Sequence, residues 1–163
     1  MNLTLTQEIS AHAGETVRIE GWLHKKRLLG GLNFITLRDR SGIAQSLIDN
    51  KEELEKLRGL QIGTVLALTG TVVADERAPG GAELHDVVVE VLVPVVAESP
   101  IEIDKPLDHK SENLDTLFEH RVIGLRNLQE TAIFKIQAGV KEAARSYFHS
   151  QDFTEFNSPK LLP

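Results

Sequence analysis

The alternation of apolar and polar residues over residues 16–96 most constrains what this chain can fold into. Val17, Ile19 and Leu23 alternate with charged or amphipathic residues, as in a strand that buries one face. Similar short runs return further on, and turn dipeptides such as Gly30-Gly31 and Ser41-Gly42 separate them. The pattern predicts five strands, at residues 17–24, 33–38, 43–48, 64–73 and 84–96. Pro94 places the end of the last strand at an edge or a bulge.

One helix is predicted between the third and fourth strands. Asn50 followed by Glu53 resembles a capping box, Leu54 and Leu57 share one face, and Gly59 follows the last turn. Five strands with a helix in this position are the order of a mainly β OB-fold, a five-stranded Greek-key barrel that binds oligonucleotides on one face. An SH3-like barrel stays open as an alternative to this fold class.

The sequence changes character after the barrel. Residues 99–112 carry prolines and scattered charges, which is the composition of a linker. Asn127 and Glu130 then predict the start of a helix that runs to about Ser150, and residues 153–157 predict a short extended segment. The predicted organisation is a barrel over 1–98, a linker over 99–112 and a helix-plus-strand extension over 113–163. Because a helix and a strand cannot enclose a core, the extension must pack on the barrel, on a second copy or on a further domain.

Ordinary catalytic and metal sites are not indicated. The chain has no cysteine, and its six histidines lack the spacing of a metal site, so neither a thiolate nor a metal ligand set is expected. No nucleophile elbow or phosphate-binding loop occurs. No apolar run approaches the roughly 20 residues of a membrane span, and the amino terminus lacks a basic start and an apolar segment. A cytoplasmic protein without a membrane partner is therefore expected.

The positive charge of the chain is concentrated in one segment. The whole sequence carries a net charge of −6, but residues 18–40 hold six basic and two acidic residues. A basic segment on an acidic body favours a partner with one anionic feature over general coating of nucleic acid.

The same segment combines the side chains that bind single-stranded nucleic acid. Lys25, Lys26 and Arg27 follow His24 at the end of the first predicted strand, while Phe34 and Gln45 lie on the next two. Strand pairing can bring them onto one face, where cations attract the backbone, a ring stacks on a base and an amide binds a base edge. The alternative is that Phe34 fills the barrel core and the basic run is a solvated strand end.

Two separate segments resemble a known family. Residues 21–27 (Gly-Trp-Leu-His-Lys-Lys-Arg), 30–34 (Gly-Gly-Leu-Asn-Phe) and 37–45 (Leu-Arg-Asp-Arg-Ser-Gly-Ile-Ala-Gln) closely resemble the anticodon-binding domain of aspartyl- and asparaginyl-tRNA synthetases. Residues 125–127, 132–137 and 152–160 look like class II motif 1, a long helix and a strand that end at a fixed proline, here Pro159. The resemblance spans about residues 14–163, and the two segments occur in the order that the family shows.

The resemblance implies roles for individual residues. Phe34 matches the aromatic residue that stacks on the central anticodon uridine, and Gln45 matches the amide that hydrogen-bonds the same base. Arg27 matches a basic residue that engages the anticodon loop, with Lys25 and Lys26 as weaker candidates for phosphate contacts. Glu83 matches a glutamate that faces a neighbouring anticodon base. A carboxylate suits that position because guanine and cytosine edges offer amino donors, although a plain surface charge stays open.

The resemblance also bears on which amino acid the parent enzyme uses. Residues 113–116 and 132–137 look like aspartyl enzymes of the archaeal type. His24 and Pro79 resemble the relaxed versions of these enzymes, which charge both tRNA(Asp) and tRNA(Asn), two tRNAs that differ in the third anticodon base. An asparagine–tRNA ligase and a discriminating aspartyl enzyme stay open, as does a role of His24 as a solvent-facing strand residue.

The family's catalytic motifs 2 and 3 do not occur in the chain. The resemblance therefore implies that aminoacylation, with its ATP and Mg2+, belongs to a domain missing from this chain, which is expected to be an inactive truncated piece without a cofactor. Ile133, Ile136 and Pro159 match the dimer interface of motif 1, so the parent is expected to be a homodimer that binds the tRNA anticodon loop. The alternatives are a stand-alone OB-fold protein that binds single strands without sequence preference, and a purely structural dimerisation module.

Overall fold

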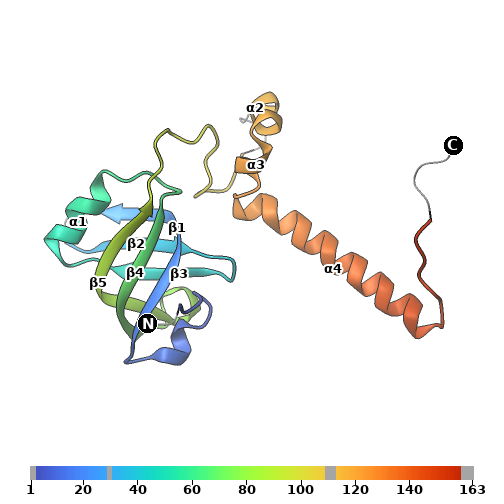
Figure 1. Cartoon of the computed structure of the whole chain (residues 1–163), viewed down its shortest axis with the longest axis horizontal. Helices are drawn as coiled ribbons and strands as arrows, with labels where there is room; N and C mark the ends of the chain where they lie inside the picture. The colour runs from blue at the N-terminus through green and yellow to red at the C-terminus, as the bar shows by residue number, and fades with distance from the viewer. Residues whose placement is uncertain (1–2, 29–30, 109–112, 159–163) are drawn as a thin grey trace. The chain divides into compact units, whose positions relative to one another are not determined.

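A computed structural model of the chain describes residues 3–28, 31–108 and 113–158. Two compact units are distinguished, Met1–Asp104 and Lys105–Pro163 (Figure 1). The first unit includes Ile101 and Ile103, which are both buried. Its elements are η1 (Ile9–His12), β1 (Thr16–Leu28), β2 (Asn33–Arg38), β3 (Ile43–Leu47), α1 (Lys51–Arg58), β4 (Val65–Ala74), η2 (Pro79–Gly81) and β5 (Ala82–Val93).

The five strands of the first unit form a closed barrel in the order β1-β2-β3-β5-β4. All neighbouring strands are antiparallel except β3 and β5, which pair in parallel. Closure removes the free edges on which a sheet of this size would otherwise aggregate. The predicted mainly β class and the position of the single helix are confirmed. β1 is longer than predicted because the basic run pairs with β2, and β5 ends directly before Pro94, which has no N–H to donate.

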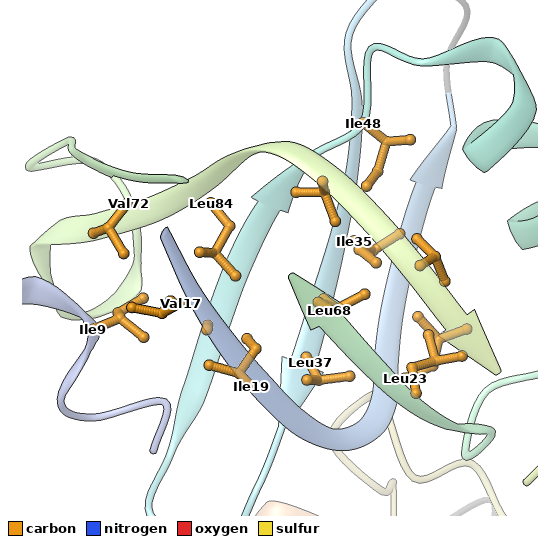
Figure 2. Packing of buried hydrophobic residues seen from close by; sticks show 14 of the residues in the cluster. Ile9, Val17, Ile19, Leu23, Ile35, Leu37, Ile48, Leu68, Val72 and Leu84 are labelled. Carbon is orange, nitrogen blue, oxygen red and sulfur yellow. The ribbon is translucent and has the colours of Figure 1, made fainter. Parts of the chain in front are cut away.

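The alternating apolar residues fill the interior of the barrel. Ile19, Leu23, Ile35, Leu37 and Leu68 have no exposed surface, and they pack against one another from β1, β2 and β4 (Figure 2). Asn50 caps the helix α1, since its side chain accepts a hydrogen bond from the backbone N–H of Glu52. Glu53, the other residue of the predicted capping box, instead accepts a hydrogen bond from the N–H of Val89 on β5 (2.8 Å). Leu57 on the buried face of α1 joins the same core.

Gly21 lies where the backbone of β1 passes close to that of β2. A Cβ atom at this position would lie 2.3 Å from the carbonyl oxygen of Arg38 and 2.8 Å from its carbonyl carbon. Both atoms belong to the backbone of β2, so no side-chain rotation could relieve the contact. Glycine is therefore required here by the close approach of two strands.

The turn between β2 and β3 is organised by the carboxylate of Asp39. This carboxylate accepts hydrogen bonds from the N–H groups of Ser41 (2.7 Å) and Gly42 (3.0 Å), and from the N–H (2.8 Å) and hydroxyl (2.7 Å) of Thr6 in the amino-terminal segment. Partial burial alone would raise the pKa of Asp39, but the hydrogen bonds from Ser41, Thr6 and Gly42 outweigh it and lower the pKa to about 2. The ionised carboxylate thus ties the start of the chain to the barrel.

We expect the stability that Asp39 contributes to depend on pH. A carboxyl group whose pKa is lower in the folded state stabilises the fold above its unfolded pKa, and this contribution is lost as the pH falls through the folded value, here from about 4 towards about 2. Urea unfolding should therefore find the wild type more stable than Asp39→Asn at about pH 7, with the difference shrinking below about pH 4. Asp49→Asn, at an exposed position, is the matched control and should show the smaller change. If the difference in free energy of unfolding between the wild type and Asp39→Asn does not vary with pH, the lowered pKa of Asp39 is contradicted.

The second unit contains three helices among its described residues, α2 (Leu114–Glu119), α3 (Arg121–Gly124) and α4 (Leu128–Ser150). Asn127 caps α4 as predicted, since its side chain accepts a hydrogen bond from the N–H of Gln129. The prediction of a strand over 153–157 is wrong. These residues form no strand in the described part of the chain, and the N–H of Phe153 donates a hydrogen bond to the carbonyl oxygen of Phe148. A strand needs a neighbour to satisfy its backbone groups, and the second unit offers none in residues 105–108 and 113–158.

Candidate nucleic-acid interface

Strand pairing brings the predicted binding residues onto one outer face of the barrel. Arg27 of β1 lies opposite Phe34 of β2, and Lys25 lies opposite Thr36. Thr36 in turn lies opposite Gln45 of β3. Residues directly opposite one another on neighbouring strands carry their side chains on the same face of the sheet.

A shallow cavity of about 260 Å³ opens on this face. It is lined by Lys25, Arg27, Phe34, Thr36 and Gln45. Its volume is below the roughly 300–1,000 Å³ of pockets that enclose a drug-sized ligand, so it suits a single flat ring. Phe34 is half-buried here and is outside the hydrophobic core cluster, so the alternative in which it fills the barrel interior is wrong.

A bulge in β1 decides which basic residues reach this face. The register of β1 against β2 shifts between Leu23 and Lys25, so His24 is an extra residue in the strand. Beyond the bulge Lys25 and Arg27 are exposed on the outside, while Lys26, between them, points the other way.

The phosphate contact predicted for Lys26 therefore needs correction, because its side chain does not reach this face. Its ammonium group donates hydrogen bonds to the backbone carbonyls of Leu57 (3.2 Å), Arg58 (3.3 Å) and Leu60 (2.5 Å) at the carboxyl end of α1. These carbonyls lie where the hydrogen-bond ladder of the helix ends, and a cation there complements the helix dipole. Burial lowers the pKa of Lys26. Its role in the structure is to hold α1 against the barrel.

The relaxed specificity was inferred from His24 and Pro79, and neither of these residues lines the cavity. His24 is only 8% exposed, and burial and then the positive charge of Arg38 lower its pKa. The alternative of a solvent-facing His24 is therefore wrong, and its ring does not line the cavity. Pro79 begins η2 and is exposed in the loop between β4 and β5.

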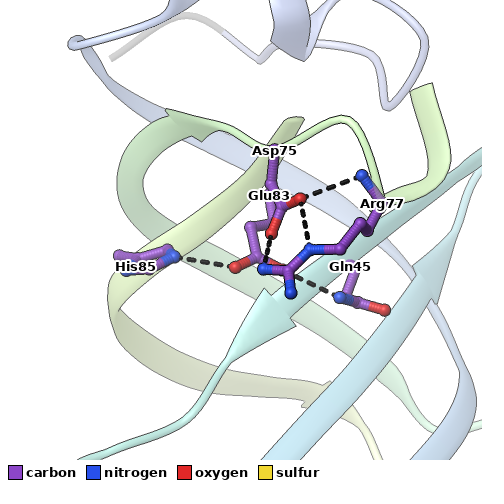
Figure 3. A network of polar contacts seen from close by, with 5 residues as sticks. All are labelled: Gln45, Asp75, Arg77, Glu83 and His85. Atoms are coloured by element: carbon purple, nitrogen blue, oxygen red, sulfur yellow. Dashed lines mark hydrogen bonds and ion pairs between the residues drawn. The ribbon is translucent and has the colours of Figure 1, made fainter. Parts of the chain in front are cut away.

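Glu83 forms the polar border of the site next to Gln45. The parallel pairing of β3 and β5 places these two residues opposite each other, and the side-chain amide of Gln45 donates a 2.8 Å hydrogen bond to Glu83 Oε2. The other carboxylate oxygen, Oε1, lies 2.8 Å from Nε2 of His85 (Figure 3). Glu83 is buried, so the surface charge left open by the sequence is excluded.

Sequence reasoning missed Arg77 in the β4–β5 loop. Its guanidinium group binds the Asp75 carboxylate through Nε (3.0 Å) and Nη2 (2.8 Å) (Figure 3), and its charge also interacts with that of Glu83. Hydrogen bonds from the Arg77 side chain and backbone lower the pKa of Asp75 to about 2. The signal that could have identified Arg77 is a basic residue just before the turn formed by Pro79, Gly80 and Gly81.

The closed barrel and its basic, aromatic and amide-bearing face define a nucleic-acid-binding domain of the OB-fold class. Residues 17–94 match the sequence model of the family described as OB-fold nucleic acid binding domain. This match covers the barrel and all of the strand residues discussed above.

Two curated relatives are similar over almost the whole chain. The Aspartate--tRNA(Asp/Asn) ligase of Methanosphaera stadtmanae is 37% identical over 154 residues, which are 92% of this chain and 34% of that protein. The enzyme of the same name from Thermus thermophilus is 37% identical over 161 residues, which are 97% of this chain and 36% of that protein. The chain therefore spans about a third of the length of the relatives that it matches.

The same family appears among solved structures. The crystal structure of asparaginyl-tRNA synthetase from Pyrococcus horikoshii complexed with asparaginyl-adenylate matches 98% of this chain and 37% of that one, with a TM-score of 0.80 and 30% sequence identity. The chain contains an OB-fold domain of the tRNA anticodon-binding type, and the relatives that match almost its whole length are Asp/Asn-tRNA ligases and an asparaginyl-tRNA synthetase. The resemblance found in the sequence is confirmed.

Proposed function

We propose that the barrel binds the anticodon loop of a tRNA on behalf of an aspartate–tRNA ligase. The observation that carries this proposal is the single cavity in which the ring of Phe34 and the amide of Gln45 lie together, with Lys25 and Arg27 on its border. An unstacked base can lie on the ring while its edge meets the amide. Stacking on an aromatic side chain contributes about 1–3 kcal/mol per base, and the two cations hold the neighbouring phosphates.

The activity of the whole enzyme is part of the proposal. The parent would join aspartate to tRNA, and the names of the relatives favour an enzyme that accepts both tRNA(Asp) and tRNA(Asn). The neighbour from Pyrococcus horikoshii is an asparaginyl-tRNA synthetase, so an asparagine–tRNA ligase is the second candidate. The described residues offer no group of three or more side chains placed to hold a metal ion, and the proposal assigns ATP and Mg2+ to the part of the parent outside this chain.

The proposal extends to a cytoplasmic homodimer. Ile133 and Ile136 on α4 are 55% and 69% exposed, and an exposed apolar helix face of this kind favours a protein partner. Pro159, the third residue expected at the dimer interface, is outside the described residues. No helix in the described part of the chain is long and apolar enough to cross a membrane.

Binding to matched RNA stem-loops tests the proposal. We expect the chain to bind a stem-loop with the anticodon GUC or GUU more tightly than one whose loop has the same composition in scrambled order, because the cavity binds one base in a fixed position. Fluorescence anisotropy with labelled RNA measures the difference. Equal affinity for both loops would indicate the alternative of a non-specific single-strand binder, while self-association without RNA binding would indicate a dimerisation module.

A further inference from the structure

We propose that His85 is a positioning residue of the base-binding site, which acts through Glu83 on the amide of Gln45 and thereby favours uracil over cytosine. This inference rests on the proposed function, since it concerns how the same cavity distinguishes bases. His85 is two residues after Glu83 on β5, so the two side chains lie on the same face of the barrel.

The Glu83 carboxylate lies between two nitrogen atoms. Nε2 of Gln45 donates to Oε2 over 2.8 Å, and Nε2 of His85 lies 2.8 Å from Oε1 (Figure 3). The Glu83 side chain is 7% exposed, whereas that of His85 is 32% exposed. The nearby Arg77 directs Nε and Nη2 to Asp75, so among the described side chains only Gln45 and His85 bond to this carboxylate.

Glu83 fixes which way the amide of Gln45 faces. A carboxylate accepts hydrogen bonds and cannot donate them, so the Gln45 amide must turn its NH2 group towards Glu83 and its oxygen away. A flipped amide would place its carbonyl oxygen against the carboxylate and lose this hydrogen bond. The oxygen and the second amide hydrogen remain for a base, in a set spatial order.

That order distinguishes uracil from cytosine. The ring nitrogen N3 carries a hydrogen in uracil and is an acceptor in cytosine, and the exocyclic group beside it is a carbonyl in uracil and an amino group in cytosine. An amide can pair with either edge, but only by exchanging the places of its oxygen and its NH2 group. An amide that Glu83 holds in one orientation therefore pairs well with only one of the two bases. We assign uracil, because it is the pyrimidine that the anticodons of tRNA(Asp) and tRNA(Asn), GUC and GUU, share under the proposed function.

His85 keeps Glu83 in the position that this requires. Without His85, one oxygen of the buried Glu83 carboxylate would lose its hydrogen-bond partner. Because an unpaired buried oxygen is unfavourable, the carboxylate would rotate towards water or another donor. The Gln45 amide would then be free to adopt both orientations. Phe34 would still stack on the base, so binding would persist while discrimination between uracil and cytosine would fall.

Two stem-loops that differ only in the central anticodon base test the inference, one with GUC and one with GCC. A good amide–base pair discriminates by about 5- to 150-fold, so the full chain should bind the GUC loop more tightly by a factor in this range. His85→Leu should reduce this ratio by about fivefold or more. His85→Gln, which restores an N–H donor of similar reach, should retain it. Glu83→Gln, which can present either an oxygen or an NH2 group to Gln45, should also reduce it.

The controls separate this inference from the proposed function. His12→Leu removes a second histidine that bonds to a glutamate, Glu15, at 2.8 Å, and should leave the ratio unchanged. Circular dichroism verifies that each variant is folded, and Glu83→Gln provides the test should His85→Leu fail to fold. If the wild type prefers the GUC loop and His85→Leu or Glu83→Gln leaves this preference intact, the positioning role of His85 is wrong and the proposed function stands. A wild-type chain that binds the GUC and GCC loops equally overturns the inference on His85, and one that also binds the scrambled loop equally overturns the proposed function.

Discussion

Phe34→Ala is expected to lower the affinity for a GUC stem-loop by about 5- to 150-fold, which corresponds to the 1–3 kcal/mol of one base stacked on an aromatic ring. The side chain is half-buried at the surface and outside the hydrophobic core cluster, so its removal should leave the barrel folded. Titration of labelled RNA, followed by anisotropy at constant salt, measures the loss.

Two further substitutions of Phe34 distinguish stacking from simple apolar contact. Phe34→Tyr keeps the ring and should retain most of the affinity, whereas Phe34→Leu keeps the apolar volume without a π face and should lose most of it. Wild-type affinity in the alanine variant would show that the base does not stack on this ring. Equal losses with leucine and tyrosine would assign the effect to packing.

Gly21→Ala should lower the stability of the barrel more than the other glycine-to-alanine substitution proposed below. The added Cβ would lie 2.3 Å from the carbonyl oxygen of Arg38, so β1 and β2 must separate to admit it. Overpacking of this kind costs about 1–3 kcal/mol or more. For a domain of this size, each kcal/mol lowers the melting temperature by about 4–8 °C, which thermal unfolding followed by circular dichroism can measure.

Gly59→Ala is the matched control for that measurement. Gly59 follows α1 with a φ of −80°, and nothing lies within 4 Å of a Cβ built there. Alanine should be neutral at this position, or stabilise the fold by about 0.4–1 kcal/mol, because it restricts the unfolded chain. Similar melting temperatures for the two alanine variants would contradict the role given to the contact between β1 and β2.

The elements that local sequence determines could be predicted well. The strands at 33–38 and 43–47 and the helix after Asn50 follow from alternation and from a capping side chain, which depend only on nearby residues. Phe34 and Gln45 could be placed on one face because they lie on neighbouring antiparallel strands. Their proposed roles came from the resemblance to a family rather than from the pattern.

Features that depend on distant pairing could not be predicted. The bulge at His24 arises where β1 pairs with β2, and the sequence of β1 alone gives no sign of it. The hydrogen bond between Gln45 and Glu83 spans 38 positions and requires the parallel contact of β3 with β5. The strand expected over 153–157 had the right local composition but no neighbour to pair with.

The bulge in β1 also determines how this segment responds to a change of length. His24 is the extra residue against β2, so without it Leu23 and Lys25 would be consecutive and the alternation of inside and outside would continue unbroken. Loss of His24 would therefore keep Lys25 and Arg27 on the outside and Lys26 on the inside, provided that residues 25–28 keep their pairing with β2. Loss of a second residue from the same run would not be compensated by a bulge and would reverse the direction of the residues on one side of it.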